Sequence, residues 1–428
     1  MVPERDAPQF SPLDKQTSMT VQNHSLSVSS GNVVEHTPRF SGTSEKERWH
    51  MITSEYPPQT GGVSDYTALV AAGLANAGDE VHVWCPQCAP ARPAGDQITI
   101  HPELGKFSPA DLKSVGKQLD SFPAPRHLFV QWVPHGYGYR SMNLAFCAWL
   151  WNRAIRHGDR VELMVHEPFL PFGRQSLRQN AAALVHRLMT VILLRAARRV
   201  WVSIPGWEPC LRPYAMGRSL MFRWLPIFSN IPVAADHDRT QAIRRQYAEE
   251  GQVLIGHFGT FGTSISSMLE GIILALAKDP EGQVVLLAGH GSEQFRDQLI
   301  RKQPGLASFV RATGKLPADA ISQHLAACDI LIQPYPDGVS SRRTSFMAGL
   351  AHGKPMVTTL GELTEPLWRE QIAVALAAPD DTQGFVEKVR RLIRDPGERL
   401  RAGRLASQLY QERFDISRTV AALRGQDR

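Results

Sequence analysis

Two Gly-rich turns are the first chemical feature of this sequence, because each follows a short apolar run and leads into a segment with helical periodicity. The first turn contains Gly61 and Gly62, and the second contains Gly259 and Thr260. Glycine lets a ligand approach the main chain, and the first N–H groups of a helix lie at the positive end of its dipole. Each turn is a candidate anion site, although a Gly pair before a helix also occurs as simple loop punctuation.

A third candidate lies in the second half, where Ser340 and Ser341 precede Arg342 and Arg343 at a predicted helix start. Guanidinium groups bind phosphate oxygens in a bidentate manner, and the helix dipole acts in the same direction. The alternative is a solvated helix face, which is what most charge pairs form. We favour a phosphate site, because this corner lies where a strand meets a helix, and open α/β sheets bind ligands at that edge.

The sequence predicts no metal site. Cys85 and Cys88 have the spacing of a metal or redox pair, but no second pair and no His cluster accompanies them. Half of a tetrahedral site binds a metal weakly.

The candidate residues lie within a repeating arrangement of apolar runs and helix-length segments. Runs at 253–258, 284–289 and 329–334, rich in β-branched residues and Leu and bounded by Gly and Pro, are typical of strands buried on both faces of a parallel sheet. A chain of 428 residues has room for two such domains. The expected fold is α/β, with two Rossmann-like, doubly wound parallel-sheet domains that face each other across a cleft.

The expected organisation has four parts. Residues 1–47 are rich in Ser, Thr, Pro and Asn without apolar periodicity, and they are predicted to be disordered. Residues 48–230 form an N-terminal domain and residues 231–404 a C-terminal domain, joined by an extended linker near 226–238. Residues 405–428 belong to a helical stretch, predicted from Gly403 to Leu423, that is expected to pack back toward the N-terminal domain.

Composition narrows the partners and the compartment. The formal charge of +6 comes from dispersed arginines without a basic block, which favours anionic ligands or surfaces over nucleic acid. Five cysteines and no secretory signal point to the cytoplasm. Arginines interrupt the most apolar stretch, 184–202, so it is expected either to cover the sheet or to lie as a basic amphipathic helix on the inner face of a membrane.

Residues 49–410 resemble a GT-B glycosyltransferase of family 4, also called glycosyl transferase group 1. The resemblance rests on the order and spacing of five segments, at 55–62, 162–168, 258–262, 287–289 and 329–359. It implies retaining transfer of a sugar from a nucleotide-diphosphate donor to a glycan or lipid-linked acceptor, in the biosynthesis of a surface polysaccharide, with no cofactor. Two alternatives remain open, a sugar-nucleotide epimerase of the same fold and a non-catalytic protein that binds sugar nucleotides.

The chain departs from this family in the donor site. The family places two glutamates eight positions apart after the strand at 329–334, whereas this chain offers Asp337 and Ser345, or Ser340 and Ala348, depending on the register. The second carboxylate, which the family uses toward the nucleotide ribose, is missing. The basic pair that the family tends to have at the second Gly-rich turn is also missing. We interpret Arg342 and Arg343 as a basic pair that replaces it from a different position in the chain.

The resemblance implies roles for further residues. His166, in a histidine loop like that of the family, and Asp337 are the candidate catalytic residues, although a lone histidine is more often structural. Tyr56, His135 and Tyr137 are candidates for stacking on and hydrogen-bonding the acceptor. The donor and phosphate contacts are assigned to Gly61, Gly62, Gly259, Thr260, Ser340, Ser341, Arg342, Arg343 and Glu365, with Glu362 as an alternative to Glu365.

Overall fold

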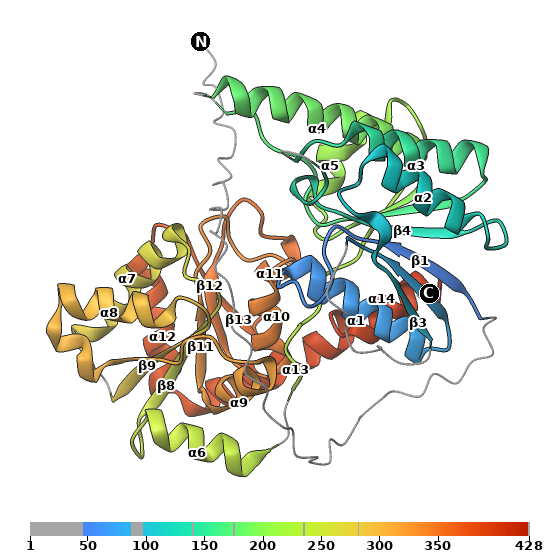
Figure 1. Cartoon of the computed structure of the whole chain (residues 1–428). Helices are drawn as coiled ribbons and strands as arrows, with labels where there is room; N and C mark the ends of the chain where they lie inside the picture. Colours follow the sequence, from blue (N-terminus) through green and yellow to red (C-terminus); the bar gives the residue numbers. More distant parts are fainter. Residues whose placement is uncertain are drawn as a thin grey trace.

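The computed structural model describes residues 46–86, 97–138, 141–173, 176–233, 236–280 and 282–426, which form two α/β lobes (Figure 1). Residues 1–45 and Cys88 lie outside the described part, so the predicted disorder of the amino-terminal segment and the cysteine pair have no structural counterpart here. Each lobe consists of one parallel sheet with helices on both faces. The predicted fold class is therefore confirmed.

The first lobe contains a sheet in which the described residues form seven parallel strands, ordered β3-β2-β1-β4-β5-β6-β7. The strands are β1 (Arg48–Ile52), β2 (Glu80–Trp84), β3 (Ile98–His101), β4 (His127–Trp132), β5 (Arg160–Val165), β6 (Ala197–Val202) and β7 (Met221–Trp224). The helices are α1 (Gly62–Asn76), α2 (Pro109–Leu119), α3 (Leu144–Arg156), α4 (Leu177–Ala196) and α5 (Trp207–Leu211). Separate hydrophobic cores cover the two faces of this sheet, which explains why its strands are apolar on both sides.

The second lobe contains a parallel sheet of six described strands, ordered β10-β9-β8-β11-β12-β13. The strands are β8 (Val253–Phe258), β9 (Gln283–Ala288), β10 (Val310–Ala312), β11 (Ile330–Gln333), β12 (Met356–Thr359) and β13 (Val374–Ala377). The helices are α6 (His237–Tyr247), α7 (Thr263–Ala277), α8 (Ser292–Lys302), α9 (Ala318–Ala327), α10 (Thr344–Ala351), α11 (Pro366–Arg369), α12 (Thr382–Arg394) and α13 (Pro396–Arg413). Short 3₁₀ turns lie at Pro102–Leu104, Pro134–Gly136, Arg212–Ala215 and Pro304–Ser308.

The order of strands reverses once in each sheet. The reversal lies between β1 and β4 in the first lobe and between β8 and β11 in the second. At such a switch point the connections leave in opposite directions, so a crevice opens at the carboxyl ends of the strands. The residues that follow β8 and β11 are therefore placed to contact a ligand.

The carboxyl-terminal segment differs from its sequence prediction. Instead of one helix from Gly403 to Leu423, α13 ends at Arg413, and a second helix, α14 (Ile416–Leu423), begins after Asp415, whose carboxylate caps it. In α14, Val420 lies so close to α1 that a Cβ on Gly73 would approach its side chain to 2.8 Å. Helix α14 thus packs on the first lobe beside α1, although the chain has already completed the second lobe (Figure 1).

The stretch 184–202 also differs from the prediction of a single amphipathic helix. Helix α4 begins earlier, at Leu177, and ends at Ala196, and the remaining residues form β6. Val200 and Val202 alternate with larger residues in β6 and are buried between β5 and β7. These residues form a strand despite their helical periodicity, because they pair with strands on both sides in the sheet.

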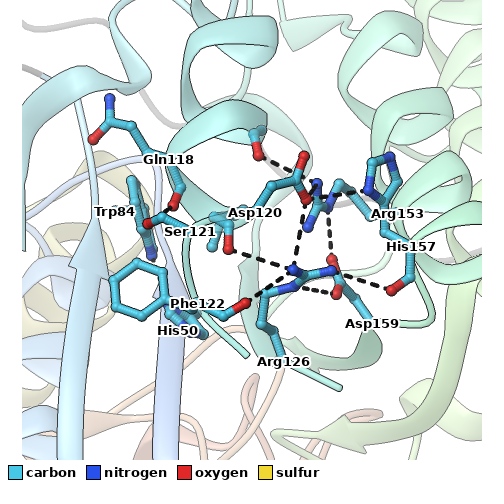
Figure 2. Close-up of polar contacts among 12 residues, drawn as sticks. His50, Trp84, Gln118, Asp120, Ser121, Phe122, Arg126, Arg153, His157 and Asp159 are labelled. Atoms are coloured by element: carbon cyan, nitrogen blue, oxygen red, sulfur yellow. Dashed lines mark hydrogen bonds and ion pairs between the residues drawn. The ribbon is translucent and has the colours of Figure 1, made fainter. Parts of the chain in front are cut away.

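A buried network of ion pairs connects the amino-terminal ends of strands in the first sheet to α2 and α3 (Figure 2). Asp159 accepts hydrogen bonds from Nε of Arg126 and Nε of Arg153, each at 2.6 Å. Arg153 also donates to Asp120 at 2.7 Å, and His157 lies 3.1 Å from the same carboxylate oxygen. Because Asp159 is fully buried, its two arginine partners are what make its charge tolerable there.

Candidate functional site

A cavity of about 790 Å³ lies between the two lobes. The first lobe contributes Thr60 and Gly62, from the loop before α1, and the second contributes residues that follow its strands. The second-lobe residues that line the cavity and bear on its chemistry are His257, Gly259, Thr260, Lys315, Arg342, Arg343, Thr344 and Ser345. Gly62 of the first Gly-rich turn and the two arginines thus border the same space.

The second Gly-rich turn brings the main chain to the edge of the cavity. It connects β8 to α7, and the N-cap of α7, Gly262, makes no side-chain cap hydrogen bond. Gly289, which follows β9, has a φ of +118°, and a Cβ there would lie 2.3 Å from the carbonyl oxygen of Gly259. Only glycine permits this approach of two loops, so both backbones stay close to the cavity.

The arginine corner lies at the amino-terminal end of α10. Arg343 is the N-cap residue of this helix and makes no side-chain cap hydrogen bond, so the first turn of α10 keeps unbonded N–H groups. Arg342 donates to Asp337 at 2.8 Å, and Arg343 donates to the other oxygen of the same carboxylate. Arg342 also lies 3.4 Å from Oε1 of Glu167, which comes from the first lobe.

These contacts orient the two guanidinium groups but do not use all of their hydrogen-bond donors. The Nε atoms of Arg342 and Arg343 are buried and have no hydrogen-bond partner in the described part of the chain. Burial, followed by the charge of Arg343, lowers the pKa of Arg342 below its ordinary value. Both observations mark a place where an additional negative charge would be stabilised.

Asp337 does not line the cavity. Its two carboxylate oxygens are occupied by Arg342 and Arg343. Its neighbour Gly338 has a φ of +84°, and a Cβ there would lie 2.2 Å from the amide nitrogen of Gly361, which fixes the loop. The contacts of Asp337 are therefore those of a residue that positions the arginines, and its predicted catalytic role stays a prediction.

Ser340, Ser341 and Glu365 are buried and lie outside the cavity lining, so the structure does not bring them to the donor space that was predicted for them. Glu365 accepts from the amide and the hydroxyl of Ser341 and, at 2.6 Å, from Nε1 of Trp368. Burial raises the pKa of Glu365 above its ordinary value despite these donors. The hydroxyl oxygen of Ser341 also lies 3.0 Å from the carbonyl oxygen of Ser203, so this buried turn contacts the first lobe.

Replacing Glu365 by glutamine tests this structural role. The amide of glutamine would turn a donor toward Ser341 or Trp368, and we expect the free energy of unfolding of the second lobe to fall by about 1–3 kcal/mol. Urea denaturation followed by tryptophan fluorescence measures the change. The matched control is Glu362→Gln, because Glu362 is exposed and belongs to the same loop. Equal stabilities for the two variants would contradict the role of Glu365.

The carboxylate of Glu55 lies at the first Gly-rich turn, which the sequence did not predict. The carboxylate of Glu55 accepts from the amide of Ser64 at 2.9 Å, and a Cβ on Gly61 would lie 2.3 Å from the same oxygen. The amino-terminal end of α1 is thus neutralised by the chain's own carboxylate. Gly62 lines the cavity, whereas Gly61 lies against the carboxylate of Glu55, so its predicted phosphate contact stays a prediction.

The two candidate histidines of the first lobe, His135 and His166, are not among the residues that line the cavity. His166 is half-buried, its Nε2 lies 3.0 Å from Oε1 of Gln131, and burial lowers its pKa to about 3. His166 is therefore neutral and held by Gln131. His135 is exposed and lies 3.6 Å from Glu167, the carboxylate that also contacts Arg342.

Tyr56 and Tyr137 belong to the hydrophobic core of the first lobe. The hydroxyl of Tyr137 donates to the carbonyl oxygen of Gln131 at 2.5 Å, and its ring stacks on Trp132 and Phe146. Tyr56 is only 3% exposed. Neither ring is available to an acceptor, which corrects both assignments.

The sequence analysis does not identify two residues of the cavity, His257 and Lys315. Lys315 lies in the loop after β10, three positions beyond its last residue, and a strand of three residues is too short to be predicted from the sequence. His257 lies inside the predicted strand at 253–258, where the apolar pattern favours a core position. Within the described ranges, no three His, Cys, Asp or Glu side chains gather as a metal ion would require, and no helix is long and apolar enough to cross a bilayer.

Residues 253–395 match the family model of the glycosyl transferases group 1. No curated protein sequence matches the chain. Among solved structures, sucrose-phosphate synthase from Thermosynechococcus elongatus is similar with a TM-score of 0.66 and 16% identity, over 89% of this chain and 98% of that chain. Anabaena HepE in complex with UDP has a TM-score of 0.63 and 16% identity, over 88% and 98% of the two chains.

WaaG, a glycosyltransferase involved in lipopolysaccharide biosynthesis, has a TM-score of 0.61 and 14% identity, over 88% of this chain and 98% of that chain. At these identities the structural matches show the fold alone, and the family match covers residues 253–395 of the second lobe.

Proposed function

We propose that this chain, a GT-B glycosyltransferase whose residues 253–395 belong to the glycosyl transferases group 1 family, transfers a sugar from a nucleoside-diphosphate donor to a glycan or lipid-linked acceptor, with retention of configuration. The observation that carries the proposal is the convergence of two guanidinium groups, an uncapped helix start and a Gly-rich turn on one cavity. All three supply positive charge or N–H donors to the same space.

The chemistry follows from where charge develops. Breaking the bond between sugar and phosphate leaves negative charge on the departing diphosphate, so donors already aimed at that position stabilise the transition state. Arg342, Arg343 and the first N–H groups of α10 can act in this way, and Lys315 adds a further cation to the cavity lining. Asp337 and Glu167 hold the guanidinium groups in place before the donor binds.

The first donor to test is UDP-glucose, because structures of Anabaena HepE hold UDP and UDP-glucose. The purified chain is incubated with a panel of nucleotide sugars, with and without glycan or lipid-linked acceptors. Release of nucleoside diphosphate that depends on the acceptor is the expected result. A changed sugar without an acceptor would indicate an epimerase, and binding without turnover would indicate a non-catalytic protein.

An exposed apolar face on α3 and α4 supports a location at a membrane. These helices pack together at the outer edge of the first lobe (Figure 1). Large exposed side chains recur on them at the same spacing, as Leu144, Trp151 and Ile155 on α3 and as Leu177, Leu184 and Leu188 on α4. Arg156, Arg178 and Arg195 are exposed on the same two helices. An apolar stripe with arginines is typical of a helix pair that lies on an anionic membrane surface.

This arrangement suits a cytoplasmic enzyme that meets a lipid-linked acceptor of a surface polysaccharide at the inner face of the membrane. It also gives a prediction. The double variant Leu184→Ser, Leu188→Ser should sediment with vesicles containing anionic lipid at least tenfold less than the unaltered chain, since each buried leucine contributes about 1.5–3 kcal/mol. The control is Leu400→Ser, because Leu400 is comparably exposed but lies on α13. Equal sedimentation of all three proteins would exclude this face as the contact.

A further inference from the structure

His257 is a buried side chain of the cavity with one ring nitrogen unused. It is 1% exposed, belongs to β8 and is one of the residues that line the cavity. It lies at the point where the order of strands reverses. Its Nδ1 lies 2.9 Å from the carbonyl oxygen of Ile332 in β11. Its Nε2 has no hydrogen-bond partner among the described residues.

The hydrogen bond to Ile332 determines which nitrogen carries the proton. A carbonyl oxygen only accepts, so Nδ1 must be the donor. Burial lowers the pKa of His257 to about 4, so the ring is neutral at physiological pH. Nε2 therefore presents a lone pair, and a buried acceptor without a donor carries a free-energy penalty that a ligand donor would remove.

The surroundings of Nε2 indicate which ligand group could reach it. A Cβ on Gly259 would lie 3.6 Å from Nε2 and 3.9 Å from the hydroxyl oxygen of Ser345, in the first turn of α10. The acceptor thus lies among the groups that we assign to the diphosphate. A fully ionised diphosphate has no proton to donate, and the donor groups of a nucleotide sugar that directly flank the diphosphate are the hydroxyl groups of the ribose and of the transferred sugar.

We infer that Nε2 of His257 accepts a hydrogen bond from a donor hydroxyl adjacent to the diphosphate, on the ribose or on the transferred sugar. The inference rests on the proposed function, because it requires a nucleotide sugar in this cavity. His257 would then be a specificity-determining residue for the donor. The family resemblance leads one to expect two carboxylates in this role, but this chain has only Asp337 at these positions, and Asp337 is paired with the arginines.

Calorimetry on the full chain and on His257→Phe tests the inference. Phenylalanine keeps a ring beside Phe261, whose centroid lies 5.3 Å from that of His257, but it removes the acceptor. The ligands are UDP, ADP and GDP, their 2′-deoxy and 3′-deoxy analogues, and UDP-glucose. The control is His352→Phe, because both ring nitrogens of His352 are hydrogen-bonded and it lies outside the cavity lining.

We expect the ratio of the dissociation constants of a deoxy analogue and its ribonucleotide to depend on His257. The unaltered chain should bind the ribonucleotide about tenfold more tightly than one deoxy analogue, and His257→Phe should bind both equally. If the hydroxyl belongs to the transferred sugar, the ratio of UDP to UDP-glucose changes instead. His352→Phe should preserve every ratio.

Two results would overturn the inference. One is His257→Phe, or His257→Leu if the first variant does not fold, with all ratios equal to those of the unaltered chain. The other is an unaltered chain that binds no nucleoside diphosphate at all, which would overturn the proposed function as well. The two failures are distinguishable because the second is seen without any variant.

Discussion

The double variant Arg342→Ala, Arg343→Ala should bind nucleoside diphosphates at least on the order of 100-fold more weakly than the unaltered chain, and its transfer rate should fall by a similar factor. Each guanidinium supplies charge-assisted hydrogen bonds worth about 1.5–3 kcal/mol. The loss is enlarged because Asp337 and Glu167 would face the incoming anion without their cationic partners. Titration calorimetry with UDP and an assay of diphosphate release measure both effects.

The control for this variant is Arg391→Ala, since Arg391 is exposed on α12 and pairs with Glu398 far from the cavity lining. The single variants show how the two arginines share the ligand. Arg342 pairs with both Asp337 and Glu167, whereas Arg343 pairs with Asp337 and lies over the ring of Tyr335, 4.6 Å from its centroid. Unchanged affinity in the double variant would remove the arginine corner from the donor site and leave Lys315 as the principal cation.

Asp159→Asn should destabilise the first lobe by about 3–5 kcal/mol, because it removes the shared anion of two buried arginines. Arg126 and Arg153 are 6% and 1% exposed, and water cannot compensate their charges (Figure 2). For a lobe of this size the loss corresponds to a fall of about 10 °C in the melting temperature. Circular dichroism and the fluorescence of the first-lobe tryptophans follow the transition.

The control is Asp297→Asn, an exposed carboxylate that pairs with Arg296 on α8. It should change stability by less than about 1 kcal/mol, as exposed ion pairs do. Because the chain has two lobes, the two probes need to be compared before a single transition is assumed. A similar melting temperature for both variants would mean that the arginines find other partners, and the network would then contribute little to the first lobe.

Several site residues could be predicted because they follow strand ends. Gly62, Gly259, Thr260, Arg342 and Arg343 all lie on the cavity between the lobes. Their position depends on local signals: a buried strand ends at a turn residue, and the carboxyl ends of parallel strands meet at one edge. The same signals predict the two-domain α/β fold.

Other predicted site residues lie outside the cavity lining, and their surroundings depend on contacts that their local sequence does not reveal. Gly61 precedes a helix as expected, but the carboxylate of Glu55 folds back onto that helix end. Glu365 is a charged residue in a loop, and only its packing against Trp368 and Ser341 makes it a buried structural group. Tyr137 could have faced either the cavity or the core, and its stacking on Phe146 decides for the core.

By itself the sequence determined the number of sheets, their parallel arrangement and the loops that carry the chemistry, because buried runs and turn residues act over short distances. Only the tertiary structure decided which polar atoms face the cavity. The free nitrogen of His257 depends on a carbonyl group 75 residues away in β11. Hydrogen-bond partners of this kind are set by how strands from separate segments come together, and no local pattern records them.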